Sequence, residues 1–155
     1  MLSAVNMLFH VLGAVIWIGG MFFAHFALRP TALEVLEPPQ RLMLWNGVLK
    51  RFFLWVWHAI IFLWISGLWR LFGEMGGFTH AKISVHIMLT LGLIMTAVFF
   101  YIFFKPYPQF KQAVANQNWL DAKNNLDKMR NLVFFNLIVG TLTLAVATAG
   151  HYGGF

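Results

Sequence analysis

An uncharged and mostly apolar run extends from Ala4 to Leu28, and the first charged side chain of the sequence is Arg29, which Pro30 follows. A helix rises about 1.5 Å per residue, so this run is long enough to cross a bilayer core of about 30 Å. A chain in lipid must satisfy its own backbone hydrogen bonds, so we predict a membrane-spanning helix that Pro30 closes. The run is too long for the apolar part of a signal peptide, and we expect it to stay in the mature chain.

The composition supports the same class. Of the 155 residues, 60% are hydrophobic and only 10% are charged, whereas a soluble domain needs more charge to cover its surface. The absence of cysteine excludes disulfides, thiolate metal sites and Fe–S clusters. A net charge of +6 could suggest nucleic acid, but the basic residues lie between the apolar runs. That placement indicates membrane topology, with the lipid bilayer as the partner and no nucleic acid.

Further apolar runs follow, each close to the roughly 20 residues that a crossing requires. With the first, their approximate bounds are Ala4–Leu28, Phe52–Phe72, Ile83–Phe104 and Leu132–Ala149. We therefore predict an all-α, four-helix transmembrane bundle that forms one domain over residues 1–155. Between the first two runs, the Glu37–Gln40 segment (EPPQ) predicts a turn, and Asn118 with Asp121 predicts a helix start before the last run.

The charge distribution predicts the orientation of this bundle. Of the 11 Lys and Arg residues, only Arg70 and Lys82 flank the second connection, and the others lie in or beside the first and third. The positive-inside rule therefore places the first and third connections in the cytoplasm. Both termini are then expected on the outer, periplasmic side of a bacterial inner membrane.

This topology divides the six histidines into two groups. The outer group contains His10, His80, His86 and His151, and the inner group contains His25 and His58. An ionisable side chain inside a span is costly to bury and is commonly functional. We therefore expect a candidate site in the outer half of the bundle and a second one in the inner half.

His10 and His86 occur at matching depth on two different spans, and facing side chains are how helical bundles hold core cofactors. This depth predicts a haem b whose iron is bound by both imidazoles. Gly13 and Trp17 share the face of His10, so the glycine could open room for the flat ring and the indole could lie against it. The protein would then act in membrane electron transfer or oxidation, with a redox partner or a porphyrin substrate.

Other basic residues extend the haem hypothesis. Lys82 and Arg70 lie at the outer rim, where they could orient the cofactor or meet its propionates. A second haem near His25 and His58 would complete a transmembrane electron path.

Two alternatives remain open. Copper could be bound by His10, His86 and His151 with nearby methionines, because Cu(I) accepts thioether ligands. The chain could instead be a cofactor-free membrane subunit, in which glycines serve helix packing and histidines bond neighbouring groups. A homo-oligomer is possible under either reading. The spans contain no carboxylate pair and no nucleophile with a base, so hydrolysis is not expected.

Three segments carry a resemblance to known proteins: FHVLGAVIWIGGMFFAHFALRP (Phe9–Pro30), LKRFFLWVWHAIIFLWISGLW (Leu49–Trp69) and MRNLVFFNLIVGTLTLAVATAG (Met129–Gly150). Together they resemble the small CopD-type integral membrane proteins, a family named for copper resistance and uptake. This resemblance covers nearly the whole chain and implies a multi-pass membrane protein with a copper-related role.

The first and third spans are also similar to the HemJ-type protoporphyrinogen oxidases, which are membrane proteins that bind haem b. Phe9 and His10 with Trp17 resemble their first helix, and His80-Ala-Lys82 resembles their His-x-Lys element. The resemblance implies that His10 and Lys82 are functional and that the chain could be a membrane oxidoreductase. This chain differs from that family in the HFALRP end of its first run and in His58 and His86.

Overall fold

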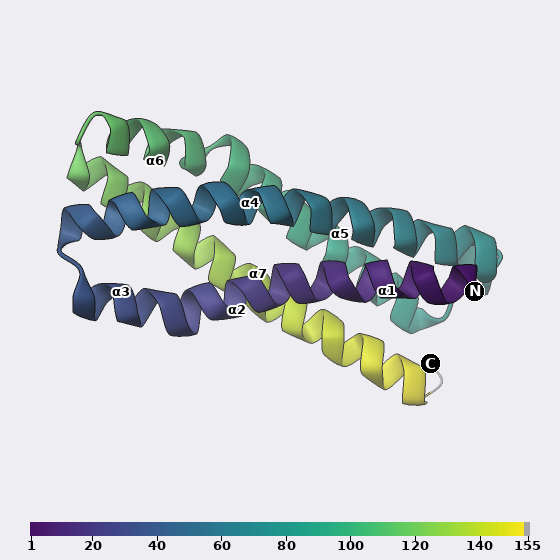
Figure 1. Ribbon diagram of the computed structural model, residues 1–155. Coiled ribbons are helices and arrows are strands. Elements are labelled where there is room, and N and C mark those ends of the chain that lie inside the picture. The colour runs from purple at the N-terminus through teal and green to yellow at the C-terminus, as the bar shows by residue number, and fades with distance from the viewer. Residues whose placement is uncertain (154–155) are drawn as a thin grey trace.

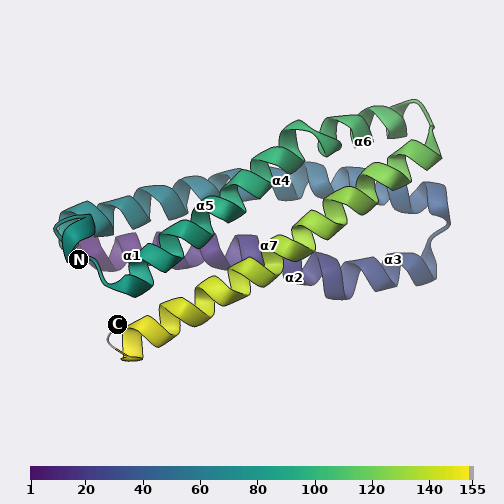
Figure 2. The same cartoon turned by 180° about the vertical axis from the view of Figure 1, so that it is seen from behind.

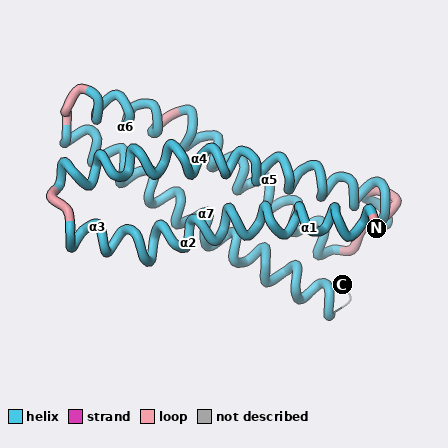
Figure 3. Tube along the Cα trace, in the orientation of Figure 1, coloured by secondary structure: helices cyan, strands magenta, loops and turns pink. Residues whose placement is uncertain are grey.

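The computed structural model describes residues 1–153, which are almost entirely helical and contain no strand (Figure 3). Four continuous helices in this part of the chain are long and apolar enough to cross a membrane. They comprise Leu2–Val35, Pro38–Glu74, Ile83–Ala115 and Trp119–Gly153. The predicted all-α fold with four spans is therefore confirmed.

The first of these helices is longer than predicted, because it does not end at Pro30. It consists of α1 (Leu2–Ala14), η1 (Val15–Gly19), α2 (Gly20–Phe23), η2 (Ala24–Leu28) and α3 (Arg29–Val35), where η1 and η2 are π-helical. Pro30 occupies the first turn of α3, directly after the wide turns of η2. A proline in a first turn is well tolerated, since its missing N–H would have no partner in that turn.

The predicted turn at Glu37–Gln40 is where the first two spans separate. α4 (Pro38–Trp69) begins there with a capping box, in which the Glu37 and Gln40 side chains each accept a hydrogen bond from the other residue's backbone N–H. α4 continues into the π-helical η3 (Arg70–Glu74). The following turn uses Gly76 and Gly77 at positive φ angles of 76° and 96°, which favour glycine.

The second half of the chain follows the predicted order. A short η4 (Phe78–His80) precedes α5 (Ile83–Phe104), whose bounds are those predicted for the third span. After a kink at Lys105 the chain continues as α6 (Pro106–Ala115). α7 (Trp119–Gly153) then carries the last span, and Asn118 donates a 2.6 Å hydrogen bond to Asp121 at its start.

The helices form two antiparallel pairs. α4 runs back along α1, while α5 and α7 pack against each other and α6 packs on the first part of α7 (Figure 1 and, from behind, Figure 2). Both termini lie at one end of the bundle, as the prediction required, and the α3–α4 and α6–α7 connections lie at the other. Which end faces the cytoplasm stays a prediction.

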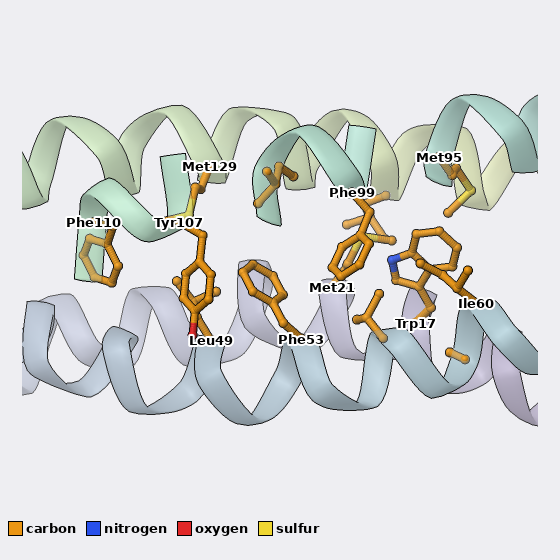
Figure 4. Packing of buried hydrophobic residues seen from close by; sticks show 14 of the residues in the cluster. Trp17, Met21, Leu49, Phe53, Ile60, Met95, Phe99, Tyr107, Phe110 and Met129 are labelled. Carbon is orange, nitrogen blue, oxygen red and sulfur yellow. The ribbon is translucent and has the colours of Figure 1, made fainter. Parts of the chain in front are cut away.

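An aromatic core joins the two pairs (Figure 4). Phe53 of α4 packs edge-on against Phe99 of α5 at a ring-centroid distance of 5.6 Å and against Tyr107 of α6 at 4.8 Å. Trp17 of η1 reaches Phe99 from the other side at 6.2 Å. The helices bury only 17–28% of their most apolar windows inside the protein, so lipid must cover the rest of that surface.

Candidate functional site

A cluster of polar side chains lies between α1 and the end of α4. The Nδ1 atom of His10 is 2.7 Å from the Ser66 hydroxyl oxygen, and Asn6 donates a 3.0 Å hydrogen bond to the Ser66 carbonyl. The Ser66 hydroxyl itself donates to the Phe62 carbonyl. With its own proton on the Phe62 carbonyl, the hydroxyl oxygen accepts a hydrogen bond from Nδ1–H of His10. This assignment leaves the lone pair of the imidazole on Nε2.

A thioether and an ion pair adjoin this histidine. Met7 lies three residues before His10 and so shares its face of α1. Its sulfur accepts a 3.1 Å hydrogen bond from the Nη1 atom of Arg70, whose Nε lies 3.4 Å from the Glu74 carboxylate. The cluster thus combines one soft sulfur, one oriented imidazole and a cation whose charge is offset by a neighbouring carboxylate.

The other outer histidines point elsewhere. The Nε2 atom of His86 lies 3.1 Å from the Phe78 carbonyl, and the two rings stack at a centroid distance of 6.2 Å. Lys82, at the start of α5, is exposed, and so is His151 beside Tyr152. Within residues 1–153, no group of three or more histidines and carboxylates suitable for a metal ion is found.

The predicted haem slot therefore receives no support. His10 bonds to α4 and His86 bonds to η4, so the structure does not show the two imidazoles facing one another across a slot. A Cβ atom on Gly13 would lie 3.0 Å from the Ala59 carbonyl oxygen, so this glycine lets α1 approach α4 closely. The packing alternative describes Gly13 better than a ring-binding face does, and Trp17 packs on Phe99.

The inner histidines are also separate. His58 is exposed, and its Nδ1 lies 2.8 Å from the Leu54 carbonyl of the same helix. His25 is half-buried and stacks on Phe134 at a centroid distance of 4.5 Å. His25 lines a pocket of about 50 Å³, whereas His58 is not among its lining residues. The structure thus gives no support to a second haem between them.

Sequence reasoning missed the partners of these histidines. Ser66 determines which nitrogen of His10 is available, and Arg29 and Arg130 line the pocket beside His25. The contact between His10 and Ser66 could have been predicted from the antiparallel course of the first two spans, because this course places the start of one span beside the end of the next. No sequence pattern indicated that Arg29 and Arg130 would meet.

Long apolar helices with polar clusters near their ends define this chain as a multi-pass α-helical membrane protein. The family model described as Copper resistance protein D (CopD) matches residues 46–149, more than half of the chain. The protein therefore belongs to the CopD family. The matched range includes Ser66 and Arg70, and α1 with Met7 and His10 precedes it.

Comparisons with curated proteins and with solved structures found no match. The resemblance to the HemJ-type oxidases receives no support from the comparisons.

Proposed function

We propose that this protein handles copper ions in a bacterial inner membrane, with copper as its cargo, and that Met7 and His10 bind the ion. Membership of a family named for copper resistance supports the choice of metal. The observation that carries the proposal is the hydrogen bond from His10 Nδ1 to the Ser66 hydroxyl. Because Nδ1 is the donor in this bond, the lone pair of Nε2 is available, and we assign Nε2 as the ligating atom.

The ligand chemistry suits Cu(I). A thioether and a neutral imidazole are both ligands that this soft ion accepts, whereas carboxylate-rich sites suit harder cations. Imidazoles that bind metals commonly donate their other N–H to a fixed acceptor, which is the role of Ser66 here. The exposed His86 lies near the start of α5 and the exposed His151 near the end of α7, and we assign them the delivery or removal of the ion.

Arg70 controls access to the sulfur. Its Nη1 atom contacts Met7 Sδ, so a copper ion must displace this guanidinium to reach the thioether. Glu74 lies four residues after Arg70, and its carboxylate can hold the displaced cation and reduce its repulsion of copper. The proposal therefore includes an exchange at Met7 between a protein cation and the cargo.

Titration of the detergent-purified protein with Cu(I), in competition with a chromophoric chelator, tests this function. Met7→Leu and His10→Ala should each weaken Cu(I) binding by about tenfold or more, since each removes one ligand. His58→Ala is the matched control, because it removes an exposed histidine outside the cluster and should leave the affinity unchanged. Unaltered binding by His10→Ala would overturn the proposal.

The same preparation tests the haem alternative. The copper proposal predicts no Soret band in protein expressed with an adequate supply of haem. A Soret band with a reduced α-band, lost in His10→Ala and His86→Ala, would instead support a b-type haem protein that acts in electron transfer or oxidation.

A further inference from the structure

Arg29, the first residue of α3, has a buried donor atom without an acceptor. The Nε atom of Arg29 is buried and has no hydrogen-bond partner in residues 1–153. The ion pairs of this part of the chain join Arg70 to Glu74 and Arg130 to Asp127, and neither includes Arg29. A buried N–H without an acceptor is costly, so this guanidinium is arranged for an acceptor that the chain does not itself provide.

The acceptor's place is the pocket of about 50 Å³ between η2, α4 and α7. His25 and Arg29 line it from the first helix, and Arg130 lines it from α7. Trp45 and Phe52 of α4 contribute apolar walls. The pocket thus has cationic side chains on two of its sides, and most of its surface is apolar.

Positive charge exceeds negative charge around this pocket. Arg130 Nη2 lies 2.9 Å from the Asp127 carboxylate, which offsets one of the two guanidinium groups. Arg29 has no such carboxylate in the described part of the chain. The stack of His25 on Phe134 fixes the imidazole at the same pocket. An anion that enters would meet one uncompensated guanidinium and further donors.

The position of the pocket selects among anions. Its lining includes residues of η2 and Arg29 of α3, and the α3–α4 connection follows them in the chain. The first half of α4 adds the basic Arg41, Lys50 and Arg51. Trp45 is an aromatic residue of the kind found at headgroup depth. Basic pockets between membrane helices bind lipid headgroups, and guanidinium groups match phosphate oxygens well. The volume admits phosphate oxygens but no whole headgroup, so the remainder of the ligand must lie along the outer wall.

We propose that this pocket binds the phosphate group of an anionic phospholipid, with the guanidinium group of Arg29 donating to a phosphate oxygen. Arg130 and His25 supply further charge and hydrogen bonds, and the acyl chains follow the apolar surface formed by α4 and α7. The site lies away from the Met7–His10 cluster and does not depend on copper binding.

Native mass spectrometry of the detergent-purified protein, titrated with phosphatidylglycerol or phosphatidylcholine, tests this site. We expect preferential binding of phosphatidylglycerol, weakened about tenfold in Arg29→Gln because a hydrogen bond to a charged group is lost. Arg41→Gln is the matched control, since Arg41 lies at the same end, is bonded to the Leu33 carbonyl at 3.4 Å and does not line the pocket. It should change binding by less than about twofold, the level expected for an exposed charge.

Further variants keep the test decisive. Arg29→Lys retains the charge but removes the planar guanidinium group, so it should also weaken lipid binding. Arg130→Gln serves if Arg29→Gln does not fold. Equal losses in Arg29→Gln and Arg41→Gln would overturn the site in favour of diffuse charge attraction. Displacement of the lipid by low millimolar inorganic phosphate would overturn the lipid assignment and indicate a site for free phosphate.

Discussion

Ser66 decides what His10 can do. A histidine at this depth can serve as a donor, an acceptor or a ligand, and the choice depends on which nitrogen carries the proton. Because the Ser66 hydroxyl donates to Phe62, its oxygen accepts from Nδ1 and Nε2 keeps its lone pair. Ser66 is buried, so this preference is not averaged by water.

Ser66→Ala therefore tests the orientation of His10 without removing a ligand. We expect Cu(I) affinity to fall by about tenfold, as is usual when the hydrogen-bond partner of a ligating imidazole is removed. Chelator competition measures the change, and Ser3→Ala, which alters an exposed serine of α1, provides the control. Full affinity in Ser66→Ala would mean that the hydroxyl does not orient the ligand.

Arg70 gives a prediction of the opposite sign. Its guanidinium competes for the Met7 sulfur and repels a second cation, so Arg70→Gln should raise Cu(I) affinity by about tenfold, the effect of one like charge at a partly wet site. Arg51→Gln is the control, because Arg51 bonds the Gly47 carbonyl within its own helix. A weaker affinity in Arg70→Gln would show that Arg70 supports the copper site and does not compete with copper.

The pairing of α1 with α4 determines where these side chains meet. Gly13 is a point of close approach, since a Cβ atom there would lie 3.0 Å from both the Ala59 carbonyl oxygen and the Leu63 side chain. Gly19, one and a half turns later, has no atom within 4 Å of such a Cβ. Two glycines of one helix thus differ in whether a side chain can be accommodated.

Gly13→Leu should consequently push α1 away from α4 and destabilise the folded protein by about 2 kcal/mol, the usual cost of overpacking. Gly19→Leu should leave stability nearly unchanged. Thermal unfolding in detergent, followed by circular dichroism, measures both variants. Similar melting temperatures for the two would contradict the close approach seen at Gly13.

Hydropathy predicted the helices better than it predicted their irregularities. The bounds of α5 match the prediction because Lys82 and Lys105 flank an uninterrupted apolar run. The first helix continues past Pro30, and the π-helical turns before that proline were not predicted. A pattern of apolar residues reports length and burial, but it does not distinguish i→i+5 from i→i+4 hydrogen bonds. Trp17, His25 and Arg70 all lie on such π-helical segments.

The arrangement of the helices explains why depth alone did not identify the partners of the histidines. His10 and His86 were matched by their distance along separate spans, but depth does not specify which neighbour a side chain faces. α1 packs mainly on α4, and α5 packs mainly on α7, so His10 finds Ser66 while His86 turns back to Phe78. Predicting these partners requires the lateral order of the helices, which the apolar runs do not encode.

The orientation in the membrane can be measured because the chain has no native cysteine. The positive-inside rule predicts that Thr79→Cys, in the connection before α5, is labelled by an impermeant maleimide added outside the inner membrane. Asn116→Cys, in the connection between α6 and α7, should be labelled only after the membrane is opened. The reversed labelling pattern would place the Met7–His10 cluster on the cytoplasmic side.

The copper K-edge X-ray absorption spectrum of the Cu(I)-loaded protein examines the ligand set itself. We expect a sulfur shell that is lost in Met7→Leu and a nitrogen shell that is reduced in His10→Ala, with each variant leaving the other shell in place. A spectrum without sulfur, or one that neither substitution alters, would contradict the assignment of Met7 and His10 as the copper ligands.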